Sequence, residues 1–231
     1  MKKKSFNYFI WLAVVLAIFI IYTLVVKFVD VSNIGPNDSA VGLSHINEFV
    51  HNLFGVNFTL YNITDLSSVV AIVPVLIFAL IGVVQLINRK KIGKVDKNIL
   101  ALGIFYIATA ITYLFFEFVV INRRPVLIDG NLEASYPSST TILSLTFFLS
   151  VLHQLKIYIH NKPLKISLSV LCIGYSAFLV VGRLLSGVHW FTDIIGAILI
   201  STALLLLYYA LYYLFEYLSR TKENNSQAQN E

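Results

Sequence analysis

Six apolar stretches, each close to the length of a membrane span, dominate this sequence. They lie at roughly 6–29, 67–87, 98–122, 139–159, 165–182 and 190–215. About 20 apolar residues suffice for a helix to cross the hydrocarbon core of a bilayer, and these stretches lack the alternation of barrel strands. With 58% hydrophobic and 13% charged residues, the chain of 231 residues suits lipid better than water. We therefore predict an all-α, polytopic membrane helical bundle of about six transmembrane helices.

The chain divides into three segments by composition. Residues 1–66 hold the first span and a long outer segment, residues 67–217 hold a core of five spans, and residues 218–231 form a polar tail that we expect to be disordered. Three lysines precede the first span, as in a signal peptide, but the apolar run continues without a small-residue cleavage site. We expect this span to be retained. The single cysteine, Cys172, excludes an internal disulfide framework.

Positive charge is distributed unevenly between the two sides of the predicted bundle. The N-terminus, the loop at 88–98, the loop at 156–165 and the residues at 220–222 hold 13 of the 17 Lys and Arg residues. Lysine and arginine accumulate on the cytoplasmic side of membrane proteins. We therefore expect cytoplasmic termini in a multi-pass protein of the cell membrane. The net charge of +5 follows from this orientation and gives no reason to expect nucleic-acid binding.

The outer segment between the first two spans has its own pattern. Gly35-Pro36-Asn37-Asp38 has turn chemistry. Beyond it, apolar residues recur at helical spacing, which predicts a short amphipathic helix on the membrane surface or across the bundle end. These residues are Ile46, Phe49, Val50, Leu53 and Phe54. We expect His45 and His51, in the same segment, to be polar interfacial residues rather than metal ligands.

Charged residues at the outer ends of the spans carry the predicted chemistry. His189 and Asp193 are four residues apart at the start of the last span, so the carboxylate can accept a hydrogen bond from one imidazole nitrogen. That bond leaves the other nitrogen as a nucleophile or base. Arg183 precedes them across a predicted turn at Ser186-Gly187, and its planar guanidinium can hold phosphate oxygens with two donors.

A second group of outer residues surrounds the end of the third span and the start of the fourth. Arg123 and Arg124 end the third span, although positive charge is scarce on this side. Ser138 and Ser139 begin the fourth, where the first amides of a helix form an anion site. Together these positions predict a phosphate-handling site at the outer membrane face.

In this order, the clusters resemble the motifs of the type 2 phosphatidic acid phosphatase (PAP2) superfamily, which includes bacterial membrane lipid phosphatases. The family motifs are Lys-x6-Arg-Pro, Pro-Ser-Gly-His and Ser-Arg-x5-His-x3-Asp. The third is nearly complete as Arg183, His189 and Asp193, with Gly182 in place of the first Ser, while the other two keep Arg124-Pro125 and Pro137-Ser138. Two departures stand out, because Glu117 replaces the Lys and Thr140 replaces the His. The resemblance runs from about residue 98 to 215.

The resemblance implies a lipid phosphatase or diphosphatase with His189 as nucleophile, Asp193 as its orienting acid, and Arg124, Arg183, Ser138 and Ser139 as phosphate-binding residues. Further candidates for the site are Arg123, Glu117, Thr140 and Gly187. It implies no cofactor and no metal; the expected partners are a phosphorylated lipid and the bilayer. Because Thr140 replaces the general acid, we expect a polyprenyl diphosphate in preference to phosphatidic acid or phosphatidylglycerophosphate. Alternatives are a phosphotransferase, or a weakly catalytic lipid-phosphate binding or transport protein.

Overall fold

A computed structural model describes residues 1–228 of the protein as a bundle of long helices. Within this range six helical stretches are long and apolar enough to span a membrane. Five of them are α1 (Lys2–Phe28), α5 (Lys97–Phe118), α6 (Ser139–Tyr158), α7 (Lys162–Leu185) and α8 (Phe191–Ala228), and the sixth runs through α3 (Phe58–Ser68), the 3-10 turn η2 (Val69–Ala71) and α4 (Ile72–Arg89). The helix α2 (Ser44–Phe54) and the strands β1 (Ser32–Gly35) and β2 (Ser39–Val41) complete the outer segment, and a 3-10 turn, η3 (Ile92–Lys94), links α4 to α5.

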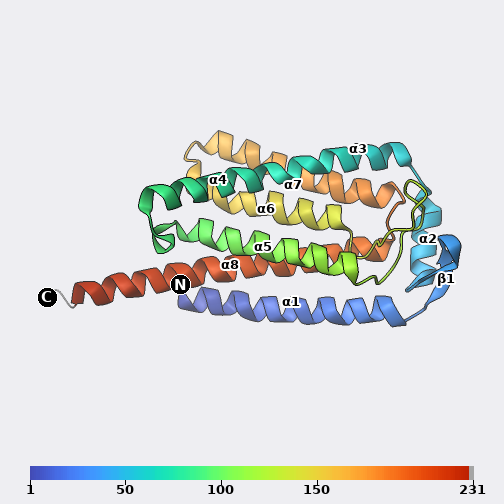
Figure 1. The fold of residues 1–231 in the computed structure, drawn as a ribbon, viewed down its shortest axis with the longest axis horizontal. Coiled ribbons are helices and arrows are strands. Elements are labelled where there is room, and N and C mark those ends of the chain that lie inside the picture. The colour runs from blue at the N-terminus through green and yellow to red at the C-terminus, as the bar shows by residue number, and fades with distance from the viewer. Residues whose placement is uncertain (229–231) are drawn as a thin grey trace.

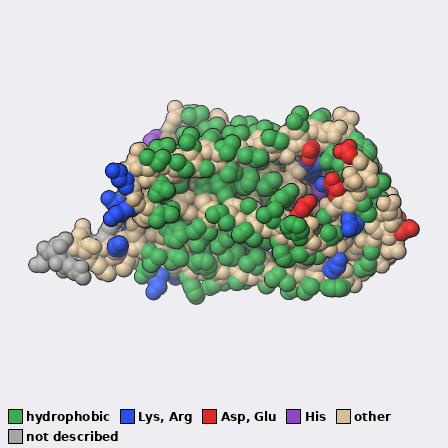
Figure 2. Space-filling model, in the orientation of Figure 1, with side chains coloured by type: hydrophobic (Ala, Val, Ile, Leu, Met, Phe, Trp, Pro, Cys, Tyr) green, Lys and Arg blue, Asp and Glu red, His purple; other side chains and the backbone are tan. Residues whose placement is uncertain are grey.

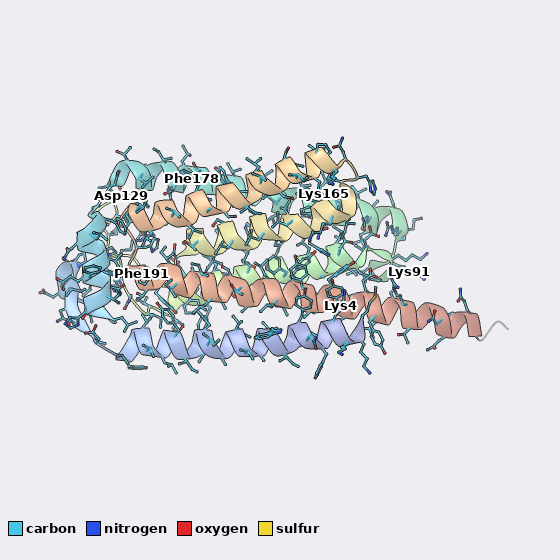
Figure 3. The ribbon with its side chains drawn as sticks, turned by 180° about the vertical axis from the view of Figure 1, so that it is seen from behind. Lys4, Lys91, Asp129, Lys165, Phe178 and Phe191 are labelled. Atoms are coloured by element: carbon cyan, nitrogen blue, oxygen red, sulfur yellow. The ribbon has the colours of Figure 1, made fainter. Side chains whose placement is uncertain are left out.

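The spans run side by side, and both chain termini lie at the same end of the bundle (Figure 1). The helix α8 packs against α1, α5 and α6, and the largest hydrophobic core cluster lies among these helices. A broad hydrophobic band covers the middle of the surface, with charged side chains at the two ends (Figure 2). Lys4, Lys91 and Lys165 lie at the end with the termini, opposite Asp129 and Phe191 (Figure 3). The predicted all-α membrane bundle is confirmed.

The second span begins earlier than the sequence pattern predicts. The apolar run starts at residue 67, whereas helix α3 begins at Phe58 and leads into α4. The additional turns contain Thr59, Asn62 and Asp65, which lower the hydropathy of this stretch. Tertiary contacts with the outer end of α7 stabilise them as helix instead. The domain boundary predicted at residue 66 therefore falls inside α3.

The C-terminal tail also differs from its expected disorder. Helix α8 continues to Ala228, so residues 218–228 are helical, while residues 229–231 lie outside the described range. Polar composition alone suggested disorder, but this stretch has no glycine or proline and includes good helix formers such as Lys, Gln and Ala. It also extends a helix that is already nucleated, so each added residue gains a hydrogen bond without a new nucleation cost.

The outer segment folds over the end of the bundle away from the termini (Figure 1). The predicted turn is the 3-10 turn η1 (Pro36–Asp38) between antiparallel β1 and β2, and the predicted amphipathic helix is α2. The buried amide of Asn47 binds the start of α8, because it accepts from the Thr192 N–H at 3.1 Å and donates to the Thr192 hydroxyl at 3.0 Å. This helix therefore braces the turn from which α8 begins.

Candidate functional site

The turn between α7 and α8 positions the predicted nucleophile. Helix α7 ends at Leu185, and Gly187 then adopts a φ of +67°, which few other residues tolerate. A Cβ atom at this position would lie 1.9 Å from the carbonyl oxygen of Gly55, so the turn also needs a residue without a side chain. The predicted reversal at Ser186-Gly187 is confirmed, and it brings His189 back over the bundle end.

His189 and Asp193 form the pair that their spacing predicts. The imidazole Nδ1 lies 3.4 Å from the Asp193 carboxylate, whose same oxygen also accepts the Trp190 backbone N–H at 2.9 Å. Both residues are buried, with His189 only 4% exposed. On the other side of the ring, Arg124 Nη1 lies 3.2 Å from Nε2. A guanidinium can only donate, so Nε2 accepts and the proton resides on Nδ1.

The surroundings of His189 favour its neutral form. Burial lowers the pKa of this imidazole well below its usual value, and the nearby positive charges of Arg124 and Arg183 lower it further. At neutral pH the ring is therefore uncharged and Nε2 keeps its lone pair. This is the protonation state that a nucleophilic imidazole needs.

Arg124 is held by the irregular segment between α5 and α6. Its backbone N–H donates to the carbonyl of Glu133 at 3.1 Å, and its Nε lies 3.0 Å from the Glu133 carboxylate. The neighbouring Arg123 points elsewhere: its guanidinium donates to the Leu132 carbonyl at 2.8 Å. The carbonyl of Arg123 accepts the Trp190 indole N–H at 2.6 Å, which fastens this segment to the start of α8. Arg123 thus supports the site without entering it.

A cavity of about 240 Å³ lies in front of His189, and Arg124 and Ser139 form part of its wall. Glu117 and Glu133 also line it, so the family departure at 117 places an acid inside the site. Its remaining lining residues are Tyr113, Phe116, Ala134, Ser135, Tyr136, Pro137 and Ile142. In this part of the surface, acidic, basic and histidine side chains meet in a recess at the end away from the termini (Figure 2).

The start of α6 supplies further polar groups beside this cavity. Ser138 precedes the helix as its N-cap residue, and its own N–H donates to the Asp193 carbonyl at 3.2 Å. The Ser138 hydroxyl makes no capping bond, and neither it nor the Thr141 hydroxyl has a hydrogen-bond partner among residues 1–228. The first amides of an α-helix also lack partners within the helix. This end of α6 is therefore equipped to receive an anion.

Arg183 is 1% exposed and is not among the residues that line the cavity. Its Nη2 donates to the Thr140 hydroxyl at 2.8 Å and to the carboxylate of Asp65 on α3, and its guanidinium stacks over the Tyr61 ring at 4.8 Å. Within residues 1–228, its Nε and Nη1 are buried without partners. Gly182, which stands in place of the first Ser of the third motif, is the point where α7 approaches α3, because a Cβ atom there would lie 2.5 Å from Thr64 Cγ2.

Of the predicted site residues, the cavity unites Arg124, Ser139, His189 and Glu117, while Ser138, Thr140, Arg183 and Asp193 lie buried beside it. Sequence reasoning missed Asp65 and Glu133, which bind the two arginines. An acid on a membrane span is costly without a partner, and this signal could have identified Asp65. Glu133 lies in the irregular segment between α5 and α6, where an acidic residue is not unusual, so nothing in the sequence pointed to it. Within the described residues, no group of three His, Cys, Asp or Glu is arranged to hold a metal ion.

Comparison with known proteins places these motifs in a family. The PAP2 superfamily matches residues 99–217 of the chain. One similar solved structure is that of a transmembrane PAP2-type phosphatidylglycerolphosphate phosphatase from Bacillus subtilis. The two chains are 15% identical, and the comparison covers 94% of this chain and 96% of that one with a TM-score of 0.49. A comparison with curated proteins found no significant match. Because the family match covers more than half of the sequence and includes the whole predicted site, the chain is a multi-pass membrane member of the PAP2 superfamily.

Proposed function

We propose that the protein is a membrane lipid phosphatase or diphosphatase that works through a phosphohistidine intermediate. One observation carries the proposal. His189 is buried, its Nδ1 faces Asp193 and its Nε2 faces Arg124, at the wall of a cavity large enough for a phosphate group. The carboxylate orients the imidazole through Nδ1 and leaves Nε2 as the nucleophile, an arrangement that suits covalent catalysis.

The proposed reaction has two displacement steps. Nε2 of His189 first forms a bond to phosphorus, while the bond from phosphorus to the lipid oxygen breaks and the lipid leaves with the electron pair. Asp193 stabilises the positive charge that develops on the imidazole through the proton on Nδ1. Water then attacks phosphorus and loses a proton to the solvent, and the electron pair of the broken phosphorus–nitrogen bond returns to Nε2.

The cationic and polar groups around His189 would bind the phosphoryl oxygens. Arg124 lies 3.2 Å from Nε2, so its guanidinium is close enough to bind the oxygens of a phosphoryl group attached to that nitrogen. The start of α6 offers the Ser138 hydroxyl and the first amides after Ser139. Fixed donors in a site with little water stabilise the charge of a transferring phosphoryl group efficiently.

The substrate class follows from the residue that replaces the family's general acid. Thr140 cannot protonate a leaving group as an imidazolium does, and its hydroxyl already accepts from Arg183. An alkoxide leaving group has a pKa near that of water, about 15.7, and needs a proton. A lipid diphosphate expels a lipid monophosphate, whose second pKa is about 6, and barely needs one. We therefore propose a polyprenyl diphosphate as the favoured substrate.

Glu117 has two alternative roles in this scheme. Its carboxyl group either turns away from bound phosphate or supplies the missing proton. In the second case Glu117→Gln lowers turnover of phosphate monoesters and spares diphosphates. Equal effects on both substrates would remove Glu117 from the proton path.

The orientation is part of the same proposal. His189 on the cavity wall precedes Phe191 by two residues, and Phe191 lies at the bundle end opposite Lys4, Lys91 and Lys165 (Figure 3). By the positive-inside rule, the termini are cytoplasmic and the site opens on the extracytoplasmic face.

Phosphate release from purified protein tests the function directly. The substrates are phosphatidic acid, phosphatidylglycerophosphate and a polyprenyl diphosphate, with EDTA present. We expect release from the diphosphate to be fastest and to disappear in His189→Ala, while lipid binding persists. Faster hydrolysis of phosphatidic acid would refute the substrate proposal. Release that survives in His189→Ala would refute the mechanism, and a wild-type protein that binds lipid without release would be a carrier. Added acceptor alcohols, with product analysis, identify a phosphotransferase.

A further inference from the structure

The most unexpected contact in the site joins a fully buried arginine to an accessible carboxylate. Arg183 on α7 is 1% exposed, whereas the Asp65 side chain on α3 is 57% exposed. The two residues are 118 positions apart, and α3 lies outside the region that carries the family motifs. The contact therefore brings a group from another part of the chain onto a predicted phosphate ligand.

The geometry of the guanidinium makes this contact consequential. An arginine grips a phosphoryl group bidentately through one of two pairs of nitrogens, Nε with Nη2 or Nη1 with Nη2. Nη2 belongs to both pairs and has two hydrogens. In Arg183 it already donates to Asp65 and to the Thr140 hydroxyl, while Nε and Nη1 are free among the described residues. Arg183 thus has unused donors but no free pair.

We propose that Asp65 is a carboxylate latch, which occupies Arg183 in the empty site and is displaced when a phosphoryl group binds. The latch rests on the proposed function, because it takes a phosphoryl group as the ligand of Arg183. Asp65 is the partner that leaves, because its side chain is 57% exposed and lies near the start of its span, whereas Thr140 is 7% exposed and fixed on α6. Asp65 then sets the affinity of the site without touching the reacting atoms.

The same principle extends to the second arginine. Glu133, 44% exposed, pairs with Nε of the largely buried Arg124. Each arginine is therefore covered by one accessible acid, and each acid mimics an anionic oxygen.

A latch and a positioning role for Asp65 predict opposite outcomes. Removal of a latch strengthens phosphate binding, whereas removal of a carboxylate that aligns Arg183 for phosphate weakens it.

The sign of the change in affinity decides between these roles. Orthovanadate, a phosphate-like anion, is titrated into purified protein in detergent, and its dissociation constant is read from the increase in melting temperature. Asp65→Asn keeps the shape of the side chain and removes its charge, so the bond from Arg183 loses its charge assistance. The difference between charged and neutral hydrogen bonds corresponds to roughly tenfold tighter vanadate binding. With a lipid substrate, KM should fall in the same variant.

Asp129→Asn is the matched control, because it removes the same charge from an exposed loop at the same end of the bundle (Figure 3). Its φ of +48° is one that asparagine accepts, and it does not line the cavity. We expect its vanadate affinity to match the wild type. An equal gain in both variants would indicate a general charge effect and overturn the latch.

Weaker or unchanged vanadate binding in Asp65→Asn would also overturn it. If this variant does not fold, Asp65→Ser is measured in its place, and failure of both would make Asp65 a structural brace and the latch wrong. The vanadate measurement does not depend on turnover. If Asp65→Asn binds vanadate more tightly but the wild-type protein releases no phosphate from any of the lipid substrates, the latch is supported and the proposed phosphatase activity is refuted.

Discussion

The close approach of α3 to α7 predicts that even the smallest side chain is not accommodated at position 182. In Gly182→Ala, the new Cβ atom would lie 2.5 Å from Thr64 Cγ2, at least about 1 Å short of an ordinary carbon contact. Thr64 cannot easily turn away, because it is fully buried and its hydroxyl donates to the Leu60 carbonyl at 2.9 Å. Overpacking of this kind costs about 1–3 kcal/mol.

The cost can be measured as a change in melting temperature in detergent. For a domain of this size each kcal/mol lowers Tm by about 2–4 °C, so we expect Gly182→Ala to melt about 2–12 °C below the wild type. Thr64→Ala removes the clashing methyl group, and in that background the same glycine change should cost less. Their coupling energy should be favourable and at least about 0.5 kcal/mol. A Gly182→Ala protein as stable as the wild type, or equal losses in both backgrounds, would refute this packing argument.

Three further predictions concern the turn, the charge beside the nucleophile and the outer helix. Gly187→Ala should prevent folding or abolish phosphate release, because both its φ of +67° and the nearby Gly55 carbonyl exclude a side chain; an active, stable variant would contradict this. In Arg124→Gln the pKa of His189 should rise, because burial still lowers it but one of the two nearby positive charges is gone. Since the neutral imidazole is the nucleophile, the acidic limb of kcat/KM should move to higher pH, measured with one substrate in both proteins; an unmoved limb would disprove this coupling. Asn47→Ala leaves buried polar groups at the start of α8 without partners and should cost about 1–3 kcal/mol of stability in the melting assay; no loss would mean that α2 does not brace this turn.

The bundle was predictable because lipid imposes a strong and local signal. Each span has to be apolar over its whole length, and a run of about 20 such residues is visible without knowledge of its neighbours. The His189–Asp193 pair was predictable because its signal is also local. A separation of four residues at the start of a helix places the two side chains on the same face. The limits of the second span were missed because α3 is less apolar than α4 and gains its stability from packing against α7.

The acidic partners of the arginines could not be found in this way. Asp65 meets Arg183 across 118 positions, and Glu133 meets Arg124 through an irregular segment without a period. Both contacts depend on how two separate elements approach each other. The differences from the family motifs at 117 and 182 were visible in the sequence. Only the fold shows that Glu117 lines the cavity and that Gly182 leaves room for the Thr64 side chain.

The charges around the cavity suggest why a carboxylate latch suits a site for phosphate. Two arginines face four acids in and around it: Asp65, Glu117, Glu133 and Asp193. The acids already outnumber the arginines, and a phosphate dianion would add two further negative charges, so repulsion falls when some of the acids move away. Asp193 is buried and cannot leave its contact with His189, whereas the two acids that pair with the arginines are exposed, as is Glu117. An empty site thus keeps its buried guanidinium groups paired, and the arrival of a stronger anion displaces the accessible acids from the arginines. Removal of Asp65 or of Glu133 should therefore tighten phosphate binding, and removal of both should do so further.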